Sequence, residues 1–531
     1  MNTTGRPTQP ADTQTQDTAK VTSTGNKALQ IAEPLIFEFA DFGGTGVDLP
    51  APEGRETRLG GMERTDPIGL PGVCEPEAMR HFVRLSQKNY AIDMGPFPLG
   101  SCTMKHNPRL NEKMARVPGF ADIHPLQPQS TVQGALGLID ELAHWLKSLT
   151  GMPAVAMSPK AGAHGELCGM MAIRAAIEAK GEAATRTRVL APESAHGTNP
   201  ATAAQCGFKV DSIPADATGR VDLEALRAKL GPDVAGIMVT NPNTCGLFER
   251  DIREIADAVH AVGGYFYCDG ANFNAIAGKA RPGDLGVDAM HINLHKTFST
   301  PHGGGGPGSG PTVLSAALAP FAPIPYVVHG ADGFELVETR RAAAAGDGAH
   351  GEGTASFGRM TAFHGQMGMF VRALAYMLSH GVDGIRQASE DAVLNANYVL
   401  TRLRAEMTST FDGYCMHEAL FDDRFLKDTG VETIDFAKAM IDEGYHPMTM
   451  YFPLVVRGAM LIEPTESESK RELDKFCDAL LSLARQAKDP ANNAMFKAAP
   501  VHAPFRRLDE TAAARKPKLR WTPEEMLKAA E

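Results

Sequence analysis

Short runs of strand-forming residues alternate with segments of helical periodicity through the middle of the chain. The strand-like runs are residues 189–190, 210–213, 236–240, 265–268 and 291–294. Between them, residues 221–230 and 252–262 place apolar side chains at the spacing of a helix. Strands that alternate with helices form a mostly parallel sheet whose two faces are both covered. The sequence therefore predicts an α/β fold, in which ligands bind at the carboxyl ends of the strands.

The length of 531 residues exceeds what one simple core usually accommodates, which indicates two or three domains. Helical segments at 361–380 and 391–407, strand-like sequence at 411–465 and a helix at 470–488 predict a smaller α+β domain on the C-terminal side. The expected divisions are a disordered polar tail at 1–30, an N-terminal extension with an active-site loop at 31–135, a large domain at 136–385, a small domain at 386–490 and a C-terminal tail at 491–531.

Charge, cysteine content and hydropathy exclude several classes of protein. The formal net charge of −11 argues against a nucleic-acid-binding surface. The eight cysteines form neither a CxxC pair nor a zinc spacing, which suits a reducing cytosol and predicts no metal site. Residues 1–27 lack the apolar core of a signal peptide, and no run approaches the roughly 20 apolar residues that span a membrane. We expect a soluble, cytoplasmic protein that binds neither nucleic acid nor membrane.

Lys296 and Asp269 are the residues that most clearly indicate a chemistry. Lys296 follows an apolar run and is soon followed by a glycine-rich segment, 303–310. Asp269 ends the aromatic run 265–268. An amine that forms a Schiff base and a carboxylate that keeps a pyridinium nitrogen protonated are what pyridoxal phosphate (PLP) requires. The pair therefore predicts a PLP site at the carboxyl edge of the sheet, with both residues catalytic and cofactor-binding.

A turn of small residues at 160–166 precedes an expected helix at 167–180. The free N–H groups at a helix start bind anions, so Ala163, His164 and Gly165 are candidates to hold the phosphate of PLP. The alternative is an ordinary tight turn with a surface histidine.

Two further turns carry candidate cofactor contacts. The imidazole of His196 could lie over one face of the pyridine ring with Ala271 on the other face, or His196 could cap the helix that follows it. Thr244 lies in a polar turn and could reach the cofactor or substrate, or shape an Asx turn. Asn272, close behind Asp269, is a further expected cofactor contact.

The glycine-rich segment 303–310 does not indicate a nucleotide site. No Lys-Ser/Thr pair follows its glycines, and it is not a GxGxxG turn after a strand. We expect a hinge or a closely packed backbone beside Lys296, where His295 is also a candidate cofactor contact. The Ala- and Gly-rich segment 342–353 is expected to form a mobile surface loop.

Long motifs along the chain resemble one known family. The segment LHKTFSTPHGGGGPGSGP, which contains Lys296, is similar to the cofactor-lysine signature of the glycine decarboxylase P-protein family. Further matching motifs are PLGSCTMKHNPRLNE at 98–112, HPLQPQSTVQGALGLI at 124–139, AGAHGELCGMMAIR at 161–174, SAHGTNPATA at 194–203, TNPNTCGLFE at 240–249, DGANFNAI at 269–276 and MTMYFPLVVRGAMLIEPTESESKRELDKF at 448–476. Because the chain contains one unit of this kind, it resembles the second subunit of the split, two-subunit form.

The resemblance implies a type I PLP-dependent transferase fold (aspartate-aminotransferase-like), with PLP bound by the large domain. It implies P-protein subunit 1 and lipoylated H-protein as partners, in a heterotetramer with two copies of each subunit. It also implies the reaction of an aminomethyl-transferring glycine dehydrogenase in the glycine cleavage system. In that reaction glycine loses CO2, and the aminomethyl group passes to the lipoyl disulfide of H-protein.

The resemblance also suggests site residues beyond the central pair. The candidate proton carriers are Lys296 and a neighbouring histidine: His196, His295 or His302. A loop at the substrate or phosphate end of the pocket is expected to comprise Ser101, Cys102, Thr103 and Lys105. Cys102 as a nucleophile is the less favoured interpretation, because PLP already supplies the covalent chemistry.

Two other functions remain open on the sequence. One is another type I PLP amino-acid decarboxylase, which would act on a larger amino acid and release a free amine. The other is a non-catalytic scaffold subunit of the same complex, against which the presence of Asp269, His196 and Lys296 together argues.

Overall fold

The computed structural model describes residues 33–39, 50, 58–66, 70, 72–303, 308–340 and 351–519. The chain divides into two compact units, one of Met1–Met94, Ile441–Gly444 and Ala494–Glu531 and the other of Gly95–Met440 and Tyr445–Asn493. The expected polar tail and most of the expected mobile loop at 342–353 lie outside the described residues. Among the helices that are described, none has the length and hydropathy needed to cross a membrane.

The first unit contains helices and little else that is described. Its helices are α1 (Ile36–Phe39), α2 (Glu75–Gln87), η2 (Ile92–Met94), α15 (Glu510–Arg515) and most of α14 (Asn493–Ala498). Glu33 joins the chain before α1 to α2, because its carboxylate accepts hydrogen bonds from the Arg84 guanidinium at 2.6 and 3.0 Å and lies 2.9 Å from His81 Nδ1. Arg84 holds the pKa of Glu33 below its ordinary value.

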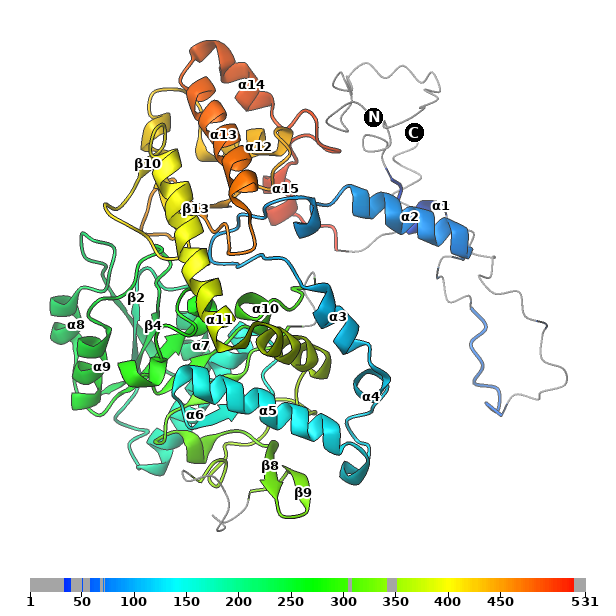
Figure 1. The fold of residues 1–531 in the computed structure, drawn as a ribbon, viewed down its shortest axis with the longest axis vertical. Helices are drawn as coiled ribbons and strands as arrows, with labels where there is room; N and C mark the ends of the chain where they lie inside the picture. The colour runs from blue at the N-terminus through cyan, green and yellow to red at the C-terminus, as the bar shows by residue number, and fades with distance from the viewer. Residues whose placement is uncertain are drawn as a thin grey trace. The chain divides into compact units, whose positions relative to one another are not determined.

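A seven-stranded sheet forms the centre of the second unit (Figure 1). Its strands are β1 (Ala154–Ala156), β2 (Arg188–Pro192), β3 (Lys209–Ile213), β4 (Val234–Thr240), β5 (Tyr265–Asp269), β6 (Ala289–His291) and β7 (Thr312–Leu314). Their order is β1-β7-β6-β5-β4-β2-β3. β7 is antiparallel to β1 and β6, whereas the pairs from β6 to β3 are parallel. The expectation of a mostly parallel α/β sheet is confirmed.

Both faces of this sheet are covered, because successive side chains of a strand point to opposite faces. In β5, Tyr265 and Tyr267 belong to a core that includes α6 (Gly162–Ala179). Phe266 and Cys268 belong to a second core with α5 (Gln133–Thr150), α9 (Ile252–Ala261) and the first part of α11 (Met367–Leu403). This alternation assigns Asp269, the next odd-numbered residue of β5, to the face that α6 covers.

A smaller antiparallel sheet follows, with strand order β10-β11-β13-β12. Its strands are β10 (Thr408–Ser409), β11 (Ala419–Asp422), β12 (Thr449–Met450) and β13 (Met460–Ile462). α11 and α13 (Lys470–Ala487) pack together here, and α11 is continuous from the large-sheet core except at Gly381, whose φ of +64° breaks the helical geometry. Both sheets belong to the same compact unit, and the expected domain boundary between 385 and 386 stays a prediction.

The remaining elements of the second unit are short. They are α3 (Arg109–Ala115), α4 (Pro118–Ala121), η3 (Gln129–Thr131), α7 (Thr198–Gln205), α8 (Leu223–Lys229), η4 (Gly270–Ala275), η5 (Pro282–Leu285), α10 (Leu294–Thr297), η6 (Ala319–Phe321), the hairpin of β8 (Tyr326–Gly330) and β9 (Gly333–Val337), η7 (Asp423–Leu426), η8 (Pro490–Asn492) and α12 (Thr433–Asp442), whose last two residues fall in the first unit.

Several element boundaries differ from those that the sequence predicted. The helices predicted at 361–380 and 391–407 are one helix, α11, which begins at Met367 and ends at Leu403. The run 291–294 is not a strand: β6 ends at His291 and Leu294 begins α10, because four apolar-rich residues cannot distinguish strand from helix. The turn predicted at 160–166 is largely helical, since α6 already begins at Gly162. The helix predicted from 221 begins at Leu223, because the Asp222 carboxylate caps it by accepting the N–H groups of Glu224 and Ala225.

Lys105 connects four parts of this unit through one ammonium group. Its Nζ donates to Glu466 Oε1 at 2.5 Å, to the Thr297 carbonyl at 2.9 Å and to Asn274 Oδ1 at 3.0 Å, and lies 3.4 Å from the Tyr376 hydroxyl. Burial opposes the charge, but Glu466 and Tyr376 outweigh it and raise the pKa of Lys105. The three N–H donors are all used, so this arrangement leaves none for the substrate or phosphate contact that the sequence suggested.

We expect Lys105→Met to lower the free energy of unfolding of this unit by about 3 kcal/mol, because it leaves the carboxylate of Glu466 without its cation in a buried site. Urea denaturation followed by the fluorescence of Trp145, on α5, measures the change. The matched control is Lys113→Met, which removes an exposed lysine from α3 and should change stability by less than about 0.5 kcal/mol. Equal effects of the two substitutions would contradict the structural role of Lys105.

Candidate active site around Lys296

Lys296 lies in α10, just beyond the end of β6. The neighbouring Phe298 is fully buried and anchors the end of this short helix in the core. The lysine side chain is itself buried, with 8% of the residue exposed, and its Nζ donates to the carbonyl oxygen of Ser101 at 2.7 Å. The side chain of Lys296 is thus fixed by one hydrogen bond and shielded from water, which places its amine in a defined position at the edge of the sheet.

Asp269 ends the neighbouring strand, β5, and is 2% exposed. Its carboxylate accepts Asn199 Nδ2 at 3.0 Å and the N–H of Ala271 at 2.9 Å, and His291 Nε2 lies 3.5 Å away. Burial pushes the pKa of Asp269 up, but His291, Asn199, the Ala271 N–H and Lys296 together hold it below the ordinary value. The carboxylate therefore remains charged, and it interacts electrostatically with Lys296.

The sequence analysis missed Glu166, a second buried acid on the same face of the sheet. It accepts Thr198 Oγ1 at 2.7 Å and Asn199 Nδ2 at 3.0 Å, so Asn199 bridges Glu166 and Asp269. Burial and the charge of Asp269 raise the pKa of Glu166 to about 7. A signal existed in the sequence, since Glu166 shares its helical face with the buried residues Met170 and Ile173 of α6, where an acid is unusual.

His196 lies at the exposed rim of this network. Its Nδ1 is 2.9 Å from Thr198 Oγ1 and accepts the N–H of Thr198, the first residue of α7, at 3.3 Å. Its ring also meets the ring of Phe452 edge-on, with centroids 5.8 Å apart. The helix-capping interpretation of this histidine is thus supported, and the exposed ring still borders the network that ends at Asp269.

The turn residues expected to touch a cofactor have protein partners in this structure. Thr244 Oγ1 donates to the carbonyl of Ser194, and Asn272 Nδ2 donates to the carbonyl of Pro242 at 3.0 Å. Both residues are buried and fasten neighbouring loops at the strand ends. Ala271 is half-buried, and its N–H binds Asp269.

The first turn of α6 contains the three residues proposed from the small-residue run. Gly165 is buried, His164 is half-buried with its Nδ1 accepting the N–H of Lys160 at 3.2 Å, and Ala163 is exposed. Gly310 packs against this turn so closely that a Cβ there would lie 2.2 Å from the Ala161 carbonyl oxygen. The predicted close-packed backbone is therefore present at Gly310, whereas residues 304–307 of the glycine run lie outside the described part of the chain.

Two histidines beside Lys296 are neutral. His295 and His302 have ring centroids 4.9 Å apart. Burial, His302 and Lys296 lower the pKa of His295 to about 3, and burial also lowers the pKa of His302, whose Nε2 is 3.2 Å from the Thr103 carbonyl. Neither ring carries a charge that would oppose the amine of Lys296 at neutral pH.

The segment 101–103 lies against the lysine, as its expected role in the site requires. The Ser101 carbonyl accepts a hydrogen bond from the amine of Lys296, and Thr103 is fully buried. Cys102 is half-buried, and burial raises the pKa of its thiol despite the charge of Lys296, which disfavours a thiolate nucleophile. Two buried glutamates hold this segment, Glu418 and Glu463, and the sequence analysis identified neither.

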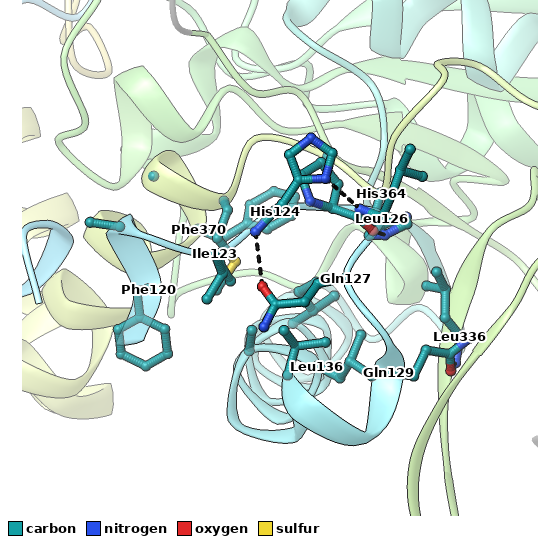
Figure 2. Close-up of a pocket in the computed structure, with 18 of the residues that line it drawn as sticks. Phe120, Ile123, His124, Leu126, Gln127, Gln129, Leu136, Leu336, His364 and Phe370 are labelled. Carbon is teal, nitrogen blue, oxygen red and sulfur yellow. Dashed lines mark hydrogen bonds between the residues drawn. The ribbon is translucent and has the colours of Figure 1, made fainter. Parts of the chain in front are cut away.

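A cavity of about 630 Å³ lies elsewhere in the same unit (Figure 2). Its walls include Phe120, Leu126, Leu136 and Phe370, and His364 Nε2 donates to the Pro125 carbonyl at 2.8 Å. None of the predicted site residues lines it. Among the described residues, its walls are mainly apolar and include no lysine, so the pair of an amine and a carboxylate found at Lys296 and Asp269 is not repeated there.

Two family models and several curated relatives match this chain. Residues 388–504 match the family model "Glycine dehydrogenase, C-terminal domain", and residues 169–306 match "Aminotransferase class-V". The chain is 67% identical over 525 residues to the probable glycine dehydrogenase (decarboxylating) subunit 2 of Caulobacter vibrioides, with 98% of each chain covered. It is 48% identical to the protein of the same name from Exiguobacterium sibiricum, covering 93% of this chain and 98% of that one.

Solved structures show the same fold at low sequence identity. An inhibitor-bound glycine decarboxylase (P-protein) of the glycine cleavage system superposes with a TM-score of 0.65 at 20% identity, over 80% of this chain and 93% of that chain. A glutamate decarboxylase of Lactobacillus brevis gives a TM-score of 0.61 at 13% identity, over 83% and 96% of the two chains. The expected transferase fold is confirmed.

We expect Glu166→Gln to reduce the loss of stability as the pH rises. In the wild type, the pKa of Glu166 is about 7 in the folded state and 4.5 in the unfolded state, so the folded state binds its proton more tightly. The contribution of this group to stability is therefore complete below about pH 4.5 and is lost as the pH rises towards about 7, where folding must keep the proton or bury a second charge beside Asp269. Between about pH 5 and about pH 8, the unfolding free energy of the wild type should fall by up to about 3 kcal/mol more than that of Glu166→Gln. Thermal midpoints across this range measure the effect.

Glu178→Gln is the matched control, since Glu178 lies at the other end of α6 with a side chain that is 51% exposed. The control should follow the wild-type pH dependence. Identical pH dependence in Glu166→Gln and the wild type would show that Glu166 does not hold the proton.

Proposed function

The chain belongs to the family of glycine dehydrogenase (decarboxylating) subunit 2 proteins, and we propose that it decarboxylates glycine with PLP in the glycine cleavage system. The resemblance noted in the sequence is thereby confirmed at the level of the family. In the proposed reaction, CO2 leaves glycine and the aminomethyl group passes to the lipoyl disulfide of H-protein. The observation that carries the proposal is the buried pair of a charged Asp269 and a Lys296 amine at the carboxyl edge of the sheet.

The residues present fit PLP on three counts. Lys296 offers the amine for the covalent bond, and the charged Asp269 offers a partner for a protonated ring nitrogen. The start of α6 has no side-chain cap, so its first N–H groups suit a phosphate. Nearby, the hydroxyls of Ser158 and Ser309 are buried and have no hydrogen-bond partner among the described residues, which supports a polar ligand at this helix end.

PLP, when bound, supplies the electron sink for the pair of electrons that departing CO2 leaves behind. The protein contributes the charge of Asp269, which Asn199, the Ala271 N–H and His291 keep in place. Because burial and the charge of Asp269 raise the pKa of Glu166 to about 7, Glu166 is partly protonated at neutral pH, which limits the negative charge that builds up beside Asp269.

Proton transfer requires a group that can accept and donate a proton beside the reacting atoms. His295 and His302 stay neutral because burial lowers their pKa values. His196 is exposed and hydrogen-bonded to Thr198, which in turn donates to Glu166. We therefore favour His196, together with Lys296, as the proton carriers of the proposed reaction.

The proposed partners are P-protein subunit 1 and lipoylated H-protein, in a heterotetramer with two copies of each subunit. The names of the relatives, which are second subunits, support a first subunit. The glycine-rich run beside Lys296 supports a second surface near the site, because glycines lose much conformational entropy when they are ordered without contacts. A partner that closes the site would also keep water from the reactive carbon.

The decisive experiment measures exchange of labelled bicarbonate into glycine, with lipoylated H-protein, before and after subunit 1 is added to the purified chain. We expect negligible exchange from the chain alone and full exchange with subunit 1. Lys296→Ala, assembled with the same partner, should retain less than a tenth of the exchange while its circular dichroism stays that of the wild type. Amine release from a larger amino acid, without glycine exchange, would instead support another PLP decarboxylase.

Asp269→Asn tests the role of the charge separately. The amide has the same shape but cannot favour a protonated ring nitrogen, so decarboxylation should slow on the order of a hundredfold to a thousandfold while PLP still binds. The visible absorbance of the bound cofactor and single-turnover CO2 release report the two steps. Decarboxylation at the wild-type rate would mean that another acid serves the ring nitrogen.

A further inference from the structure

Two buried glutamates face each other beneath the segment that contacts Lys296. Strand β11 pairs antiparallel with β13, so that Ala419 lies opposite Ile462. The next residues outward from this pair are Glu418 and Glu463, and both are fully buried. Two buried carboxyl groups this close disfavour each other's charge, and burial together with Glu463 raises the pKa of Glu418 well above its ordinary value, so this arrangement needs a function or a compensating contact.

Hydrogen bonds from the segment 101–103 supply that contact. The N–H of Ser101 donates to Glu418 Oε2 at 2.6 Å. The N–H and the hydroxyl of Thr103 donate to the two oxygens of Glu463 at 3.1 and 2.5 Å. Each glutamate thus binds one residue of the segment, and the acids fix its backbone from below.

Ser101 is held in a conformation that it would not adopt on its own. Its φ is +59°, in the left-handed region that favours glycine, and such a residue costs about 1–3 kcal/mol unless its surroundings impose it. The preceding Gly100 packs against β13, where an added Cβ would lie 2.2 Å from Leu461 Cγ. Glu418 and this close approach together impose the conformation of Ser101.

The consequence of that conformation is the direction of the Ser101 carbonyl. It accepts the amine of Lys296 at 2.7 Å. Under the proposed function, on which this step rests, the Lys296 amine would be free for part of the reaction, and a free amine needs a hydrogen-bond acceptor in a site with little water.

We infer that Glu418 is a positioning residue, which holds Ser101 in its left-handed conformation so that the Ser101 carbonyl binds the Lys296 amine whenever that amine is free. Glu463 supports the same segment through Thr103. The inference concerns a resting site for the lysine, and Glu418 acts through Ser101 without touching the reacting atoms.

A bound cation is the alternative explanation for the same acids. His417, Glu418 and Glu463 offer ligand atoms that all lie within 4.8 Å of one another, and both ring nitrogens of His417 lack a hydrogen-bond partner among the described residues. The hydrogen bonds from Ser101 and Thr103 already occupy both carboxylates, which favours the positioning role.

The test measures the reactivity of the Lys296 amine in the full-length, cofactor-free chain. Trace labelling with acetic anhydride at fixed pH, followed by peptide mass spectrometry, gives the rate at Lys296 relative to the exposed Lys113. We expect Glu418→Gln to raise this relative rate about fivefold, because the amide that replaces the acceptor of the Ser101 N–H also presents N–H donors to Ser101, so the segment is held less firmly and the amine loses its fixed acceptor. No cofactor or substrate is present, so a failure of glycine decarboxylation would not affect the result.

Three further variants separate positioning from general damage. Glu249→Gln is the control, since Glu249 is also a buried glutamate that accepts a backbone N–H and a side-chain amide, and it should leave the Lys296 rate unchanged. Ser101→Gly added to Glu418→Gln should restore most of the wild-type rate, because glycine adopts a positive φ without strain. Gly100→Ala, which pushes the segment off Leu461 without altering either acid, should raise the rate as Glu418→Gln does.

A Lys296 rate that is unchanged in Glu418→Gln, or raised equally in Glu249→Gln, would overturn the inference. If Glu418→Gln does not fold, an unchanged rate in Gly100→Ala has the same meaning. Elemental analysis of the purified wild-type chain tests the cation: a stoichiometric divalent metal, whose removal by a chelator reproduces the labelling of Glu418→Gln, would also overturn it.

Discussion

A carboxylate enclosed by protein must be matched by hydrogen-bond donors and positive charge, or it takes up a proton. The elements around Asp269 are arranged to meet this requirement: α7 provides Asn199, β6 provides His291, and the turn after β5 provides the N–H of Ala271. Asn199 also donates to Glu166, on α6. Glu166 is the acid that tends to take up a proton, because its pKa is raised to about 7. Asp269 is thus the charged acid of the pair and Glu166 the one that more readily takes up a proton, and the amine of Lys296 interacts with Asp269.

The alternation of side chains along the strands explains why these groups meet. Tyr265, Tyr267 and Asp269 point to the α6 face of the sheet, whereas Phe266 and Cys268 point to the opposite core. The network therefore depends on the register of β5, which sets the face to which each side chain points. A shift of one residue would turn the side chain of Asp269 into the other core. Lys105 adds a second constraint, because its ammonium group joins the segment before α3 to α10, η4 and α11.

Much of the large sheet could be predicted from the sequence, because strand-forming runs such as 236–240 and 265–268 are bounded by turn residues and separated by helical periodicity. Lys296 and Asp269 could be identified for a similar reason, since each ends an apolar or aromatic run where a charged residue is conspicuous. Glu418 and Glu463 could not, because only the pairing of β11 with β13 brings them together. Short elements also escaped prediction: α10 has four residues, too few for a period to appear.

The hydrogen bonds of Ser101 and Thr103 reach glutamates that lie 317 and 360 residues further along the chain. A ribosome releases a protein from its N-terminus, at about 5–20 residues per second. The segment that contacts the Lys296 amine is therefore among the first parts of the second unit to be made, yet it has nothing to bind until β11 and β13 have emerged. The strands of the large sheet, Asp269 and Lys296 are all synthesised within that interval. The last strands of the small sheet must therefore be synthesised before the Ser101 carbonyl can be fixed beside the Lys296 amine.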